Sequence, residues 1–139
     1  MIVAVDTSVV ISYLLSSDAQ HHAASVLMKK YRPCIHRHAL SEAFSILTGG
    51  KLHFRLIASE AAELLRDEIL PRVKTTELDD AELLDAMAVS QARGVRGCAI
   101  YDFLHLTAAR KMKAARFYTS DVSDFKSIHR SGDPEIFHL

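Results

Sequence analysis

The chain opens with an uninterrupted apolar run, Met1–Val5, which ends at an acid, Asp6. Such a run is typical of a strand that is buried on both faces of a parallel sheet. A second apolar run, Val9–Leu15, begins after only two polar residues. A carboxylate at the carboxyl end of a buried strand lies where open α/β sheets bind their ligands. The opening residues therefore predict an α/β fold and make Asp6 a candidate functional residue.

The rest of the chain alternates between strand-like and helix-like segments, which also favours the α/β class. We expect strands at Ile2–Val5, Pro33–Ile35, around Val73, Arg116–Thr119 and Glu135–Leu139. We expect helices at Ser8–Leu15 (capped by Thr7 or Ser8), from a cap at Ser17 or Asp18 to Lys30, at His38–Leu47, from Ser59 to Pro71, from Asp79 or Asp80 to Gly94, and from Gly97 to Ala108. No repeat or linker interrupts this pattern. The prediction is one domain, residues 1–139, built as a three-layer α/β/α sandwich around a parallel sheet of about five short strands.

Composition narrows the class of protein further. The 17 basic and 17 acidic residues cancel, so overall charge does not point to nucleic-acid binding, and we expect local basic patches such as His36–His38 to be solvated. No apolar stretch approaches the roughly 20 residues that cross a bilayer, and the N-terminus lacks the basic leader of a signal peptide. Cys34 and Cys98 have neither the number of a disulfide framework nor the spacing of a zinc site. We expect a cytoplasmic protein with no membrane partner.

Four acids occupy comparable positions in the predicted fold. Asp6 and Asp121 each follow a predicted strand, while Glu42 and Asp102 lie early in predicted helices. If the two strands are central and parallel, all four carboxylates can reach the same edge of the sheet. They would repel one another there unless a cation neutralised them, and Mg²⁺ and Mn²⁺ prefer such hard oxygen ligands. The pattern indicates a divalent-metal site that hydrolyses phosphodiesters by metal-activated water.

Each acid also has a structural interpretation. A single Asp after a strand is usually a helix cap. A Glu near a helix start usually interacts favourably with the positive end of the helix dipole. Asp102 is harder to explain in this way, because apolar residues flank it and an unpaired buried acid is costly. Asp124 fits a cap or turn, with a supporting role at the site as the less favoured interpretation. The eight histidines show no zinc-binding spacing. For His105, on the same helix face as Asp102, we favour a partly buried packing role, with contact to substrate or to a neighbouring acid as the less favoured interpretation.

Four segments together resemble the PIN domain, and within it the VapC-like toxin ribonucleases of prokaryotic toxin–antitoxin pairs. They are Val5–Val9, His38–Thr48, Ala99–Ala109 and Tyr118–Phe125. They occur in the family's order and at its approximate spacing, so the resemblance covers nearly the whole chain. One departure is Cys98, which stands where many relatives carry glycine.

The resemblance implies a function and a set of residues for it. It implies that Asp6, Glu42, Asp102 and Asp121 form the family's acidic metal site, supported by the hydroxyls of Thr7 or Ser8 and of Thr119. Asp124 is near enough in sequence to compete for the fourth position, and we prefer Asp121 because it directly follows the strand. It also implies an endoribonuclease that depends on Mg²⁺ or Mn²⁺. The implied partners are an RNA substrate, a second copy of the chain in a homodimer, and a cognate antitoxin that inserts a segment into the active-site groove.

Two other functions remain as alternatives. A phosphatase with Asp6 as nucleophile normally needs a second Asp two residues later, and this chain has Ser8 there. A PIN-like module could instead hold RNA or a protein without cutting. Metal-dependent cleavage that is lost in Asp102→Asn would indicate the nuclease, whereas binding that survives this change would indicate the module.

Overall fold

The computed structural model describes residues 1–139 and contains one five-stranded sheet in the order β3-β2-β1-β4-β5. All neighbouring strands run parallel. The strands are β1 (Val3–Val5), β2 (Cys34–His36), β3 (Lys74–Thr76), β4 (Arg116–Thr119) and β5 (Glu135–His138). The central strand is β1, where Ala4 lies opposite Cys34 of β2 and Phe117 of β4. The predicted parallel sheet is therefore confirmed.

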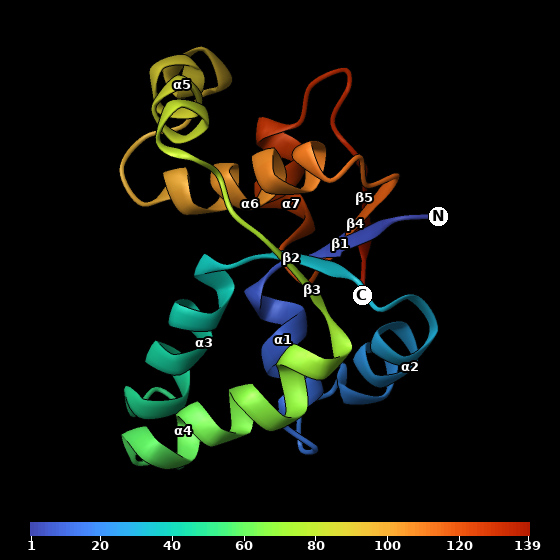
Figure 1. Cartoon of the computed structure of the whole chain (residues 1–139), viewed down its shortest axis with the longest axis vertical. Coiled ribbons are helices and arrows are strands. Elements are labelled where there is room, and N and C mark those ends of the chain that lie inside the picture. Colours follow the sequence, from blue (N-terminus) through green and yellow to red (C-terminus); the bar gives the residue numbers. More distant parts are fainter.

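Helices cover both faces of this sheet, as the three-layer prediction requires. They are α1 (Thr7–Leu14), α2 (His21–Tyr31), α3 (His38–Thr48), α4 (Ala58–Leu64), η1 (Leu65–Ile69), η2 (Leu70–Arg72), α5 (Asp80–Ser90), η3 (Gln91–Arg93), α6 (Ala99–Lys111) and α7 (Val122–Ile128). Helices α1 to α4 lie on one side of the sheet and α5 to α7 on the other (Figure 1). None of them is long and apolar enough to cross a membrane.

The apolar core consists of two clusters separated by the sheet. Val5 belongs to the cluster under α1 to α4, whereas its neighbour Ala4 belongs to the cluster under α6 and α7. Successive side chains of a strand point to opposite faces, so a strand covered on both sides must be apolar at every position. This explains the uninterrupted apolar run at the start of the chain.

The structure differs from the predicted elements in three details, of which one is a wrong helix start, one a shift of a single residue and one a missed helix. Helix α2 begins at His21 rather than near Ser17, because the Asp18 carboxylate accepts a hydrogen bond from the Gln20 amide (2.8 Å) in a turn that precedes the helix. The third strand begins one residue after Val73. Helix α7 was not predicted, because its seven residues bury only Phe125 and Ile128 and so give little periodic signal.

The core on the α6–α7 side gives a first prediction. The Phe117 ring is fully buried and packs against the Phe125 ring at a centroid distance of 4.6 Å. Phe117→Ala should lower the free energy of unfolding by about 3–5 kcal/mol, because it removes apolar contacts and leaves a cavity. Urea denaturation measures this loss. As a control, Leu84→Ala on α5 should change it by less than about 0.5 kcal/mol, since Leu84 is 62% exposed. Equal effects of the two changes would contradict the assigned core.

Candidate active site

Two of the four predicted acids are brought together by neighbouring strands. Asp6 follows β1 at the start of α1, and Asp121 follows β4 at the start of α7. Strands β1 and β4 are adjacent and parallel, with Val5 opposite Tyr118. Their carboxyl ends therefore lie at the same edge of the sheet, as the sequence pattern predicted.

Asp6 is buried and held by hydroxyl groups from both strand ends. Ser8 Oγ donates to Asp6 Oδ1 (2.5 Å), and Thr119 Oγ1 donates to Asp6 Oδ2 (2.7 Å). The same hydroxyls accept hydrogen bonds from the next turn, Ser8 from the Ser120 amide (3.0 Å) and Thr119 from the Asp121 amide (2.9 Å). This network fixes the orientation of the Asp6 carboxylate.

The predicted N-cap of α1, Thr7 or Ser8, is wrong. Asp6 itself occupies the N-cap position, in place of Thr7 or Ser8, yet its carboxylate makes no capping hydrogen bond. The Thr7 hydroxyl is buried and makes no hydrogen bond of normal length, and it lies beside Glu42, whose pKa it helps to lower. Since buried polar groups are nearly always paired, this hydroxyl marks a place where a bound group can supply a partner.

Glu42 comes from α3 and interacts with a histidine on α6. His105 Nε2 donates to Glu42 Oε1 at 2.5 Å, although the two residues are 63 positions apart, and His38 Nε2 lies 3.8 Å from the same oxygen. Burial by itself raises the pKa of Glu42, but the hydrogen bond and charge of His105, together with His38, outweigh it. The pKa of Glu42 is therefore lowered, and this acid is held ionised.

Asp102 and Asp6 are affected in the opposite direction. Burial, followed by the charge of Asp6, raises the pKa of Asp102 to about 6, with smaller contributions from Asp124 and Glu42 and a partial offset from His105. Burial also raises the pKa of Asp6, against the hydrogen bonds from Ser8 and Thr119, and Asp121 adds to the rise. The carboxylates thus act on one another electrostatically, which makes them one acidic cluster.

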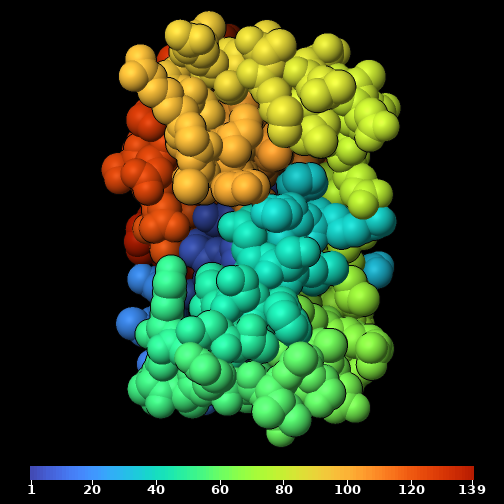
Figure 2. Space-filling view, turned by 90° about the vertical axis from the view of Figure 1, so that its left-hand side faces the viewer, coloured from blue at the N-terminus to red at the C-terminus, as the bar shows by residue number.

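The cluster lies in a hollow on the molecular surface. Figure 2 shows the N-terminal segment at the floor of this hollow, with α3 below it, the start of α6 above it and the segment around residue 120 to one side. Asp102 and Glu42 are partly exposed, Asp121 and Asp124 are exposed, and Asp6 is almost fully buried. The structure therefore places Asp124, in the first turn of α7, near the acids as well.

The donor chemistry of this cluster suits a hard cation. Its ligand atoms are carboxylate and hydroxyl oxygens, which Mg²⁺ and Mn²⁺ prefer. No group of three or more His, Cys, Asp or Glu side chains is arranged to hold a metal ion. One physical reason lies in the contacts above, since Glu42 is turned to His105 and both Asp6 oxygens already accept hydrogen bonds. The side chains therefore have the oxygen atoms that such a cation prefers, but in this structure the oxygens do not converge on one point.

Sequence reasoning missed the aromatic and histidine side chains beside the acids. His38 stacks on Tyr101 at a centroid distance of 5.1 Å, and the His36 ring meets the His105 ring edge-on at 5.8 Å. His105 is buried as expected, but it packs and also bonds Glu42. The sequence signal for His36 and His38 was a patch that we expected to be solvated; instead His36 is only partly exposed.

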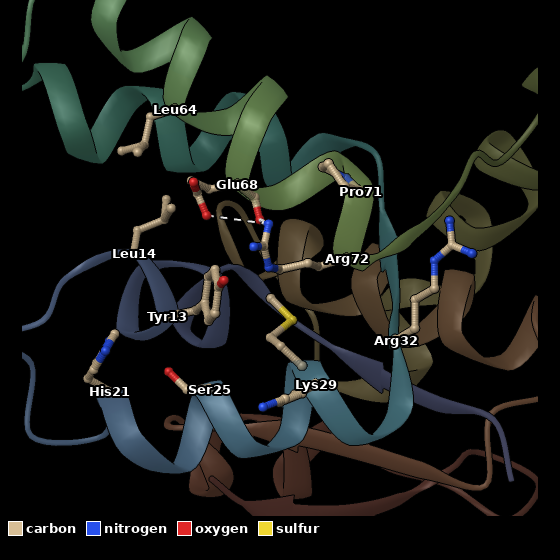
Figure 3. Close-up of a pocket in the computed structure, with 11 residues that line it drawn as sticks. Tyr13, Leu14, His21, Ser25, Lys29, Arg32, Leu64, Glu68, Pro71 and Arg72 are labelled. Carbon is tan, nitrogen blue, oxygen red and sulfur yellow. Dashed lines mark hydrogen bonds and ion pairs between the residues drawn. The ribbon is translucent and has the colours of Figure 1, made fainter.

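The largest cavity lies elsewhere. It has a volume of about 810 Å³ and opens between α1, α2 and the segment from α4 to η2 (Figure 3). Its walls carry Tyr13, His21, Lys29 and Arg32, and an ion pair between Arg72 and Glu68 (3.3 Å). None of the predicted site residues lines it. Cavity size therefore does not locate the chemistry of this chain, whereas the acidic cluster does.

Comparisons with known proteins agree with this fold. A model of the PIN domain matches residues 3–130. VapC20 from Mycobacterium tuberculosis, described as a sarcin–ricin loop cleaving toxin, is 19% identical with a TM-score of 0.70, over 95% of this chain and 99% of that one. VapBC2 from Rickettsia felis, bound to a DNA fragment from their promoter, is 16% identical with a TM-score of 0.69, over 100% and 99%.

VapBC-1 from nontypeable Haemophilus influenzae is 17% identical with a TM-score of 0.67, over 99% of this chain and 98% of that one. No curated protein matches the sequence. At these identities the solved structures establish a shared fold along nearly the whole chain.

The raised pKa of Asp102 gives a prediction for the protein in EDTA. A raised pKa means that the folded state binds the proton more tightly than the unfolded state, so the charged form destabilises the fold at neutral pH. Asp102→Asn should therefore raise the free energy of unfolding at pH 7.5. This gain should shrink as the pH falls through about 6 and vanish near pH 4, where the wild-type carboxyl is protonated.

Urea denaturation at several pH values measures the difference between the two proteins. Asp85→Asn, a change of an exposed acid on α5, is the matched control and should shift stability by less than about 0.5 kcal/mol. An Asp102→Asn variant that is clearly less stable than wild type at pH 7.5 would show that the carboxylate has a structural role.

Proposed function

Because the chain belongs to the PIN domain family, whose model matches residues 3–130, we propose that it is a VapC-like toxin, a divalent-metal-dependent endoribonuclease that hydrolyses RNA phosphodiester bonds. The observation that carries this proposal is the acidic cluster of Asp6, Glu42 and Asp102, in which the charges of Asp6 and Glu42 raise the pKa of Asp102. A chain that only needed stability would gain by replacing such acids.

Asp6, Glu42, Asp102 and Asp121 would hold the Mg²⁺ or Mn²⁺ ion, with support from Thr7, Ser8, Thr119 and Asp124. A bound ion would supply an activated water and neutralise charge on the phosphate. Ser8 Oγ and Thr119 Oγ1 keep the Asp6 carboxylate in one orientation. His105 Nε2 keeps Glu42 deprotonated. Asp102 is more accessible than Asp6, so it is the acid placed to meet both cation and RNA.

We also propose a cognate antitoxin and a homodimer as the protein partners. Two of the similar structures are described as VapBC2 and VapBC-1, and the first is bound to a promoter DNA fragment. We propose the cytoplasm as the compartment. In support, both cysteines of this chain are free, and a reducing compartment keeps cysteines in this state.

A non-catalytic module that binds RNA or a protein is the second candidate. The observation in its favour is that no three of the candidate ligand side chains are arranged around a metal position. The two candidates differ in metal binding and in cleavage, and each difference can be measured.

Metal binding can be measured without any substrate. If the carboxylates hold the ion, Mg²⁺ or Mn²⁺ at about a hundred times its dissociation constant should stabilise the fold by about 2.7 kcal/mol. The gain should be lost in Asp6→Asn and in Asp102→Asn, and kept in Asp85→Asn. Thermal unfolding against metal concentration gives the result. Equal stabilisation of all four proteins would place the ion outside the acidic cluster.

Cleavage tests the enzyme directly. Antitoxin-free protein should cut end-labelled structured RNAs in Mg²⁺ or Mn²⁺ and not in EDTA. Asp102→Asn and Glu42→Gln should reduce the rate by about a hundredfold or more, because even residues that only support metal ligands typically contribute 10–100-fold. Asp85→Asn should cut at the wild-type rate. If folded, metal-loaded protein cuts no RNA in a panel of messenger, transfer and ribosomal RNAs, the non-catalytic module becomes the better explanation.

A further inference from the structure

A second, smaller pocket adjoins the acidic cluster. It has a volume of about 430 Å³ and lies between the end of β2, the start of α3, helix α5 and the start of α6. His36, His38, Leu83, Met87 and Tyr101 are among its lining residues. The Tyr101 side chain is 45% exposed, which is unusual for a large ring that already stacks on His38. The pocket thus presents an aromatic face to solvent.

The pocket and the acidic cluster share a wall. Tyr101 directly precedes Asp102 on α6, and His38 Nε2 lies 3.8 Å from Glu42 Oε1. His36 lies behind this wall and meets His105, the residue that holds Glu42. A ligand whose phosphate reaches the acids would therefore have its neighbouring group beside Tyr101.

The chemistry of the pocket favours a flat, uncharged group. Arg37 and Glu77, the charged side chains among its lining residues, neutralise each other in an ion pair of 2.8 Å. Burial, followed by the charges of His105 and His38, lowers the pKa of His36 to about 4, so this ring is neutral at pH 7. Leu83 and Met87 add apolar surface. A nucleobase entering the pocket would find a ring to stack on.

We propose that this pocket binds a base of single-stranded RNA next to the phosphodiester at the acidic cluster, with Tyr101 as the stacking platform. This inference rests on the proposed function and adds to it a residue, Tyr101, that positions a base of the substrate. Bases of a duplex are stacked on their neighbours and cannot enter a side pocket, whereas bases of loops and single strands can be splayed onto aromatic side chains. An unpaired base is therefore the occupant that fits beside Tyr101.

Binding of a fluorescein-labelled single-stranded RNA of mixed sequence tests the proposal. The background is Asp102→Asn without added metal ion, which prevents cutting during the measurement and removes the Asp102 charge that would repel the phosphate. Adding Tyr101→Ala should weaken binding by roughly 5- to 150-fold, the usual effect of losing one base–aromatic stack. Tyr101→Phe should keep the affinity, because the ring remains. Tyr31→Ala, a matched loss of a tyrosine ring at the end of α2, should also keep it.

An abasic oligomer of the same length and charge separates stacking from backbone contacts. The parent and its Tyr101→Ala variant should bind this oligomer equally. Equal RNA binding by the two proteins, no RNA binding by the parent, or an equal loss on both oligomers would each overturn the proposal. The second of these outcomes would leave a protein ligand as the occupant of the pocket.

A fluorescence signal gives an independent readout. The chain contains no tryptophan, so Tyr101→Trp introduces a single reporter ring at the pocket. Single-stranded RNA should quench it, while the abasic oligomer should not. Failure here is distinguishable from failure of the proposed enzyme. Wild-type cleavage with binding that does not depend on Tyr101 rejects only the base pocket, and base-dependent binding without any cleavage rejects only the nuclease.

Discussion

The buried carboxylate of Asp6 is the constraint on which the rest of the site depends. It lies where β1 and β4 end side by side, and both of its oxygens accept hydrogen bonds, one from Ser8 and one from Thr119. Through the amides of Ser120 and Asp121 the same hydroxyls fix the turn after β4. The hydrogen bonds of a single buried acid therefore connect the β1–α1 turn to the β4–α7 turn. This connection fixes the position of Asp121, which begins the second turn.

The neighbouring groups that stabilise the charged carboxylate differ from one acid to the next. Hydroxyl donors partly offset the burial of Asp6, and His105 compensates Glu42 fully enough to lower its pKa. Asp102 has no comparable partner, and its pKa rises to about 6. A phosphodiester would add further negative charge beside acids whose pKa is already raised. A cation between Asp102 and RNA would relieve this repulsion, and the donor chemistry of the cluster suits such an ion.

Local patterns in the sequence were enough to predict the sheet and the acids, but not the contacts between them. Val3, Ala4 and Val5 are apolar because helices cover both faces of β1, so the strand was visible in the sequence. Asp6 and Asp121 were visible because each follows a strand. The bond between His105 and Glu42 joins residues 63 positions apart, and no local periodicity encodes such a pair.

The sequence also could not show whether Thr7 or Ser8 donates its hydroxyl to the Asp6 carboxylate. Both carry a hydroxyl next to Asp6, and only the backbone path into α1 decides that Ser8 reaches the carboxylate while Thr7 does not. The same holds for Tyr101 and His38, which stack across two helices that the sequence cannot place relative to one another.

The neutrality of the chain gives the aromatic pocket its importance. With 17 basic and 17 acidic residues, the protein has no net field to draw in a polyanion, and at the site itself the field of the acids is repulsive. Attraction to RNA must then come from short-range contacts and from a cation held by the acids. Stacking on Tyr101 is a short-range contact that does not depend on charge, and the one carboxylate that lines the pocket, Glu77, is paired with Arg37 at 2.8 Å. Such a site can discriminate RNA by the exposure of its bases rather than by its charge.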